Sequence, residues 1–275
     1  MKTSSKLVLS AVAIASAAFA QTSYADPGVA YNIGVMNEYR YRGLGQTRGK
    51  PALQGGLDFD AGNGFYLGAW GSNIKWIKDQ STDTQDVKGS VELDLYGGYK
   101  FEAGGLGYDV GFLRYQYVSN KLQDAAGSGA GVTYKNANTN EIYGAVTAGA
   151  FMAKYSYAMS NLFGNYNFDK SQSTRGSYYL DLSYTVDIGN GMTLVPHVGR
   201  QKLKHLDGAS NVSGNPSYTD FALTLNKDLG AGLSASVAAI GTNADKNVYT
   251  IAPSGSSVNY YQGKSQLVAG LKYTF

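Results

Sequence analysis

An alternation of apolar and polar residues recurs from about residue 29 to the end of the chain, and it constrains the fold more than any other feature. A period of two is typical of β-strands, because successive side chains point to opposite faces of a sheet. No stretch shows the period of an amphipathic helix. The pattern predicts twelve strands, at residues 29–42, 50–60, 63–74, 88–102, 106–118, 138–148, 150–160, 175–188, 191–202, 217–229, 232–242 and 264–275.

The connections between these segments are alternately short and long. The short ones carry Gly and Asn, which supply the positive φ of hairpin turns, as in Gly62-Asn63-Gly64. An outer-membrane barrel has short turns at one end, long loops at the other end and an even number of strands. We therefore predict an all-β, antiparallel up-and-down transmembrane β-barrel over residues 26–275, with short periplasmic turns and long outer loops. The long connections are 43–49, 75–87, 119–137, 161–174, 203–216 and 243–263.

Several segments have one apolar and one polar face. In a soluble sheet the apolar face would cover a core, whereas in a membrane barrel it faces lipid and the charges face the lumen. We predict the membrane sense, because the loop alternation and both chain ends agree with it. Segments 63–74 and 138–148 are ambiguous and stay unassigned. The apolar face predicted for segment 29–42 comprises Val29, Tyr31, Ile33, Val35, Tyr39 and Tyr41.

The two ends of the chain indicate export. Lys2 and Lys6 precede a short apolar run, and small residues offer cleavage after Ala20 or Ala25, so residues 1–25 are predicted to be a signal peptide. The last strand ends with Tyr273 and Phe275 on its apolar face. A terminal aromatic residue is typical of outer-membrane barrels, whose assembly machinery reads the final strand.

Composition limits the chemistry that the chain can perform. There is no Cys, which excludes disulfides, thiol catalysis and most structural zinc sites. The net charge is +3, and it falls to +1 without Lys2 and Lys6. No basic stripe for a nucleic acid is present. We predict no cofactor and no nucleic-acid partner.

Charged residues on the predicted lumen faces are the candidate pore-lining residues. One interpretation is that they pair across strands and stabilise the lumen; another is that they border a water-filled path and set its selectivity. Their mixed, slightly acidic character favours neutral or cationic solutes. Twelve strands leave room for a narrow pore that loops or long side chains could constrict. The candidates are Glu38, Arg40, Arg42, Asp58, Glu92, Asp94, Lys100, Asp109, Lys154, Asp181, Asp220 and Lys272.

Few residues suggest catalysis or metal binding. His197 shares a face with Gln201 and is expected to line the lumen, while Ser183 and Asp181 could approach it in some strand registers. That combination leaves an outer-membrane hydrolase open as a further alternative. Asp79, Asp83 and Asp86 share one long connection, but their spacing matches no calcium loop, so we predict a solvated acidic segment.

One block of sequence points to a family. Tyr39-Arg-Tyr-Arg-Gly-Leu-Gly-Gln-Thr-Arg48, together with Gly64-Phe-Tyr-Leu-Gly-Ala-Trp-Gly-Ser-Asn73, resembles the opening of the TorF family of porin-like proteins. Glu92-Leu-Asp-Leu-Tyr-Gly-Gly-Tyr99 and Gly176-Ser-Tyr-Tyr-Leu-Asp-Leu182 fit the same family. The resemblance covers nearly the whole chain after the signal peptide. It implies an outer-membrane barrel that acts as a channel, and it supplies no catalytic residues.

The sequence thus predicts a non-enzymatic porin-like channel in the bacterial outer membrane, for passive diffusion of ions or small polar solutes. Its expected partners are outer-membrane lipids, the barrel-assembly machinery and those solutes. The alternative is a structural or surface-interaction barrel with an occluded lumen.

Overall fold

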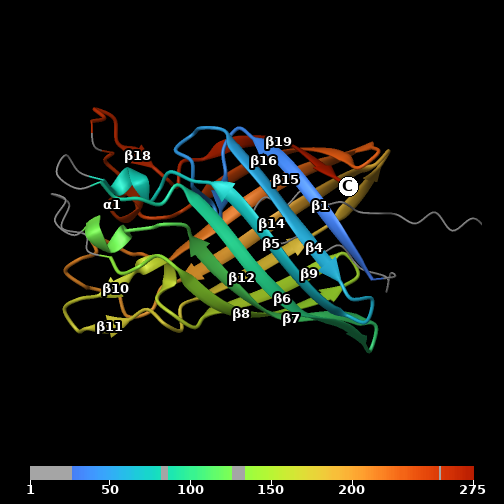
Figure 1. Ribbon diagram of the computed structural model, residues 1–275, viewed down its shortest axis with the longest axis horizontal. Helices are drawn as coiled ribbons and strands as arrows, with labels where there is room; N and C mark the ends of the chain where they lie inside the picture. Colours follow the sequence, from blue (N-terminus) through green and yellow to red (C-terminus); the bar gives the residue numbers. More distant parts are fainter. Residues whose placement is uncertain (1–26, 82–85, 126–133, 254) are drawn as a thin grey trace, which may run out of the picture.

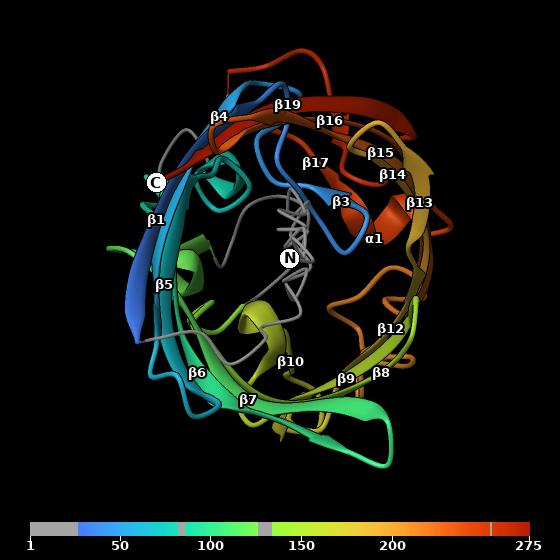
Figure 2. The same cartoon turned by 90° about the vertical axis from the view of Figure 1, so that its right-hand side faces the viewer.

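The computed structural model describes residues 27–81, 86–125, 134–253 and 255–275, so the predicted signal peptide lies outside the described residues. Within these ranges the main sheet contains 13 antiparallel strand segments, and the pairing of β12 with β14 closes it into a ring (Figure 2). β12 and β13 are consecutive pieces that both pair with β14, so they act as one barrel strand. The barrel of about twelve strands predicted from the sequence is confirmed.

Every predicted segment contains one barrel strand, and each strand pairs with its neighbours in the chain except at the seam. There, β1 pairs with β19, and the backbone of Phe275 exchanges two hydrogen bonds of 2.9 Å with that of Tyr31. The strands are β1 (Gly28–Met36), β4 (Ala52–Asp60), β5 (Phe65–Asn73), β6 (Val91–Ala103), β7 (Leu106–Tyr117), β8 (Thr139–Ala148), β9 (Phe151–Ala158), β12 (Tyr178–Tyr184), β13 (Val186–Gly189), β14 (Met192–Lys202), β15 (Tyr218–Gly230), β16 (Leu233–Thr242) and β19 (Gln266–Thr274).

Long and short connections lie at opposite ends of the barrel (Figure 1). We call the two ends the loop end and the turn end. The turn end carries the five short connections, at 61–64, 104–105, 149–150, 190–191 and 231–232. The loop end carries the small elements η1 (Lys78–Gln80), η2 (Leu122–Ala125), β10 (Tyr166–Asn167), β11 (Gln172–Ser173), α1 (Lys246–Tyr249), β17 (Thr250–Ile251) and β18 (Tyr260–Tyr261). No helix of the described residues is long and apolar enough to cross a membrane.

The apolar faces of the strands point outward and the polar faces point inward. On β15, Phe221 and Leu223 are 52% and 48% exposed, whereas Asp220 is 2% exposed. Apolar residues exposed on every side need an apolar surrounding, because a soluble monomer rarely shows apolar patches of such extent. The structure therefore has the predicted orientation, with apolar faces outward and charged faces toward the lumen. Both unassigned segments follow it: Leu67 and Ile142 face outward, whereas Tyr66 and Tyr143 point inward and bond to each other.

Aromatic residues form a belt on the outer surface at the turn end. The rings of Phe65 and Tyr99 are 4.6 Å apart, and those of Phe101 and Tyr108 stack at 5.0 Å. Amphipathic rings at this height suit the boundary between lipid tails and head groups. Tyr273 and Phe275, the predicted assembly signal, stack at 5.4 Å within the same belt.

Glycine on the inner wall lets tyrosine rings lie flat against the barrel. A Cβ atom at Gly68 would lie 2.3 Å from the ring of Tyr96 on the neighbouring strand, and one at Gly199 would lie 1.9 Å from the hydroxyl of Tyr179. A large ring covering a glycine on an adjacent strand restores the side-chain packing that the glycine lacks.

One strand prediction was wrong in extent. Segment 29–42 was expected to be a single strand with Tyr39 and Tyr41 facing lipid, but β1 ends at Met36 and Tyr39 is 1% exposed inside the barrel. Arg42 and Gly43 both have positive φ, which turns the chain back sharply. The period of two continues through residue 42, because these residues form a second, internal hairpin with its own alternation.

Candidate functional site

The connection from β1 to β4 folds into the barrel, where it is visible around β3 in Figure 2. It forms a hairpin of β2 (Arg40–Tyr41) and β3 (Leu44–Gly45). Arg42 and Gly43 form the turn with φ of 46° and 78°, as a two-residue turn with both central residues in the left-handed region requires. We call residues 38–47 the lumen hairpin.

The lumen hairpin is fastened at its base by Arg40. Its Nε donates to Glu38 at 2.8 Å, and its Nη1 donates to the carbonyl oxygens of Gly43 and Gln262 at 3.0 and 2.9 Å. Its Nη2 donates to Gln266 Oε1 of β19 at 3.0 Å, and the Tyr260 hydroxyl donates to Glu38. Arg40 and Glu38 are fully buried, so this pair is compensated by several hydrogen bonds, as a buried ion pair requires.

The tip of the hairpin reaches the far side of the barrel. Arg42 donates to Glu141 of β8 and to Gln201 of β14, both at 2.8 Å, and its guanidinium lies 4.5 Å from the ring centre of Tyr179 on β12. A Cβ at Gly43 would lie 2.5 Å from Cβ of Asp220 on β15. The hairpin therefore extends across the lumen from the seam side. Hydrogen bonds of Arg40 to Gln262 and Gln266 hold its base, and the buried ion pair of Arg42 with Glu141 holds its tip.

One face of the hairpin packs on β6 and β7. The Tyr39 hydroxyl donates to Glu92 at 2.6 Å, its ring meets Trp70 edge-on at 5.4 Å, and the hydroxyl of Tyr41 bonds with that of Tyr115. Buried apolar residues of the adjoining loops, including Ile77 and Leu122, extend this packing. The loop end of the lumen is thus narrowed by a packed cluster and not only by the barrel wall.

Between the hairpin and the turn end, tyrosine hydroxyls and lysine ammonium groups contact their neighbours along the inner wall of β5 to β9. Tyr66 donates to Asp109 at 2.7 Å and bonds with Tyr143. The ammonium groups of Lys154 and Lys100 lie 4.0 and 4.7 Å from the ring centres of Tyr143 and Tyr66, in cation–π contact. On the neighbouring part of the wall, Tyr96 of β6 donates to Asp58 of β4 at 2.5 Å, and Lys272 of β19 lies within electrostatic range of the same carboxylate.

His197 lies on the opposite wall between two acids. Its Nε2 is 3.0 Å from Asp181 Oδ1 and its Nδ1 is 3.6 Å from Asp220 Oδ1. Tyr179 donates to both oxygens of Asp220, at 3.1 and 3.0 Å. Ser183 pairs with His197 in the strand register, yet among the described residues no hydrogen bond joins their side chains. The histidine lines the lumen as expected, and its contacts there are with acids and a tyrosine.

All twelve predicted lumen residues lie inside the barrel, although three of them are not on its wall. Nine extend from barrel strands, whereas Glu38, Arg40 and Arg42 belong to the lumen hairpin and are buried in ion pairs. They were expected along an open strand face, and this placement corrects that expectation. Sequence reasoning missed Glu141, because segment 138–148 was left unassigned; alternation of Ile142 and Val146 with Glu141 and Tyr143 is the signal that could have found it.

The acidic connection after β5 was expected to be a solvated segment, but its Asp79 is buried. Asp79 lies 3.3 Å from Arg48, which joins this loop to the base of the lumen hairpin. Burial raises the pKa of Asp79, and Arg48, Lys75 and Lys78 act in the opposite direction. Asp83 lies outside the described residues. Within the ranges that the structure covers, no group of three or more His, Asp or Glu side chains is placed to hold a metal ion.

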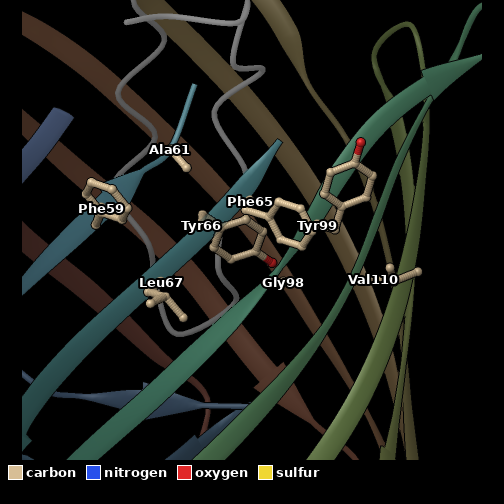
Figure 3. Close-up of a pocket in the computed structure, with 8 residues that line it drawn as sticks. All are labelled: Phe59, Ala61, Phe65, Tyr66, Leu67, Gly98, Tyr99 and Val110. Atoms are coloured by element: carbon tan, nitrogen blue, oxygen red, sulfur yellow. The ribbon is translucent and has the colours of Figure 1, made fainter. Parts of the chain in front are cut away.

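A shallow apolar depression of about 430 Å³ lies on the barrel wall near the turn end (Figure 3). It lies between the aromatic rings of Phe59, Phe65 and Tyr99, with Leu67 and Val110 below. Since these side chains belong to the outer face, this depression opens on the outside of the barrel.

Comparison with solved structures finds porins and channels. The chain resembles a NanC porin (TM-score 0.49, 11% identity, 90% of this chain and 99% of that chain covered) and a KdgM porin (0.47, 10%, 90% and 98%). It also resembles the COG4313 outer membrane channel from Pseudomonas putida F1 (0.45, 13%, 91% and 95%). Scores and identities this low establish neither a shared substrate nor a shared activity. No curated protein matches the chain.

A family match covers residues 20–275, which includes every strand of the barrel. The family is described as bacterial proteins of unknown function, so membership assigns no activity. By this match, the chain belongs to the Gcw_chp family of bacterial proteins.

Proposed function

We propose that this protein is an outer-membrane channel for passive diffusion of ions or small polar solutes. The observation that carries the proposal is a closed barrel with an apolar outer surface and a lumen wall of charged residues and tyrosines. An outer surface of this kind suits lipid, and a charged lumen suits hydrated solutes.

The lumen hairpin supports a narrow passage. It crosses the barrel at the loop end and is anchored at base and tip, so solutes would pass beside it in the space that it leaves. Charged groups on the hairpin and on the wall would then sort the solutes by charge, as rings of charged side chains do in channels.

The remaining elements of the proposal concern location and partners. Residues 1–25 would direct export, the belt containing Tyr273 and Phe275 would contact lipid and the assembly machinery, and the turn end would face the periplasm. The resemblance to TorF porin-like proteins supports the same assignment. We propose no enzymatic activity, since the contacts of His197 are with acids and a tyrosine.

Single-channel recording tests the proposal. The refolded mature protein is inserted into a planar lipid bilayer, with folding checked by heat-modifiable migration on a gel. Discrete current steps are expected. A correctly folded barrel that inserts and gives no current would contradict the channel.

A structural or surface-interaction barrel is the second candidate, because the packed cluster around the lumen hairpin favours occlusion. The same recordings separate the two candidates. If only a variant lacking the hairpin conducts, the native lumen is closed and the outer loops become the functional surface.

A further inference from the structure

In the described part of the lumen every cation has an acidic neighbour, but not every carboxylate has a cation. Arg40 faces Glu38, Arg42 faces Glu141, Lys100 and Lys154 lie near Asp109, and Lys272 lies near Asp58. Two carboxylates on the inner face of β6, Glu92 and Asp94, make no ion pair with any described residue.

These two carboxylates have different surroundings. Glu92 accepts a hydrogen bond from the hydroxyl of Tyr39, at 2.6 Å, and lies opposite Tyr117 in the strand register. Asp94 is 9% exposed, and its buried Oδ1 has no hydrogen-bond partner in the described part of the chain. The charged side chains that act on it, Glu92 and Glu141, are both negative.

An isolated buried carboxylate is unfavourable, because burial removes water without supplying a donor or a positive charge. A cation at this position would compensate the charge of Asp94 while both of its oxygens remain acceptors. The described chain supplies no cation for Asp94, and the negative neighbours of this carboxylate favour a positively charged partner.

The strands beside Asp94 add aromatic side chains. In the strand register Asp94 lies opposite Trp70 of β5 and Tyr115 of β7. Rings of this kind attract cations by their faces, so they suit a cation that has lost part of its water shell. Because no group of three acidic or histidine ligands is arranged for a metal ion among the described residues, a tightly bound divalent ion does not fit.

We propose that Asp94, with Glu92 beside it, forms a binding site for a small monovalent cation, either an alkali ion or a primary ammonium group, on the path through the lumen. The proposal rests on the channel function and deepens it, since a weak site of this kind lets a cation enter and leave. The site lies on β6, three residues from the first residue of that strand at the loop end, next to the face of the lumen hairpin that packs on β6.

Reversal potentials under a salt gradient test the site in a conducting channel. Wild type is expected to prefer potassium over chloride, and Asp94→Asn is expected to lower that preference by roughly threefold or more. Asp94→Glu, which keeps the charge, should retain the preference. Asp228→Asn is the matched control, because it removes the same charge at the exposed turn end and can keep the turn contact to the backbone N–H of Gly230.

Methylammonium chloride in place of potassium chloride distinguishes the two cation sources. Loss of preference in Asp94→Asn with potassium alone assigns an alkali-ion site, and loss with methylammonium alone assigns an ammonium site. Unchanged selectivity with both salts, in a variant of verified fold, overturns the proposal. If Asp94→Asn does not fold, Asp94→Ser provides the neutral variant.

Thermal unfolding separates this site from the channel function. A cation that binds only the folded state raises the melting temperature, so wild type in detergent should melt higher in potassium chloride than in the chloride of bulky N-methylglucamine. Asp94→Asn should lose that difference. A wild type without current but with the cation-dependent shift would refute the channel and keep the site, whereas absence of the shift in a conducting protein would refute the site alone.

Discussion

At the scale of single residues, Arg42 connects the lumen hairpin to the far wall of the barrel. It is the cationic partner of buried Glu141, and it also bonds Gln201. Breaking one side of a buried ion pair leaves an uncompensated charge, which costs about 3–5 kcal/mol. We therefore expect Arg42→Gln to lower the free energy of unfolding by that amount, as measured by urea titration of the barrel in lipid vesicles.

The same substitution should release the tip of the hairpin, so single-channel conductance should rise. The double variant Arg42→Gln, Glu141→Gln is the control, because it removes both charges and should recover much of the lost stability. If the single variant were as stable as wild type, the buried charge of Glu141 would not need Arg42 as its partner.

At the scale of the strand, packing of tyrosine against glycine sets how the inner wall is built. Gly68 on β5 leaves the space that the Tyr96 ring of β6 occupies, and Tyr96 in turn donates to Asp58. Gly68→Val would push this ring off the wall, and overpacking of this kind costs about 1–3 kcal/mol. Gly144→Val on the outer face of β8 is the control for the change of residue type, since no atom lies within 4 Å of a Cβ at that position.

Both glycine variants are measured by the urea midpoint of the folded barrel in lipid vesicles. Gly68→Val should unfold at a lower urea concentration than Gly144→Val. Equal midpoints would mean that the Tyr96 ring can move off the wall without lowering the stability of the barrel. The interpretation that inner glycines leave the space for tyrosine rings would then be wrong.

At the scale of the whole molecule, the outer surface determines how the barrel sits in lipid. Val237 lies near the middle of β16, and Leu229 lies near the turn end of β15; both are about half exposed. Arginine facing lipid costs about 2–4 kcal/mol at the bilayer midplane and about 0–1 kcal/mol near the interface. We expect Val237→Arg to destabilise the protein in phosphatidylcholine vesicles much more than Leu229→Arg, and equal effects would contradict the proposed membrane span.

Much of this architecture could be predicted from the sequence, because consecutive residues of a barrel strand point to opposite faces, one toward the lumen and one toward lipid. Alternation of Asp181 with Leu180 and Leu182 locates both the lumen and the lipid side, and the spacing of Gly-rich turns determines which strands are neighbours. Closure, strand number and the inward direction of the nine charged residues on barrel strands followed from these local patterns.

Only the tertiary structure decided what fills the lumen. Arg40 and Arg42 alternate with Tyr39 and Tyr41 as a barrel strand would, yet they form a hairpin inside the barrel whose partners, Glu141 and Gln262, lie far away in the chain. Alternation encodes which side of a strand a residue occupies. It carries no information on whether that strand joins the wall, because that depends on contacts that exist only after the ring has closed.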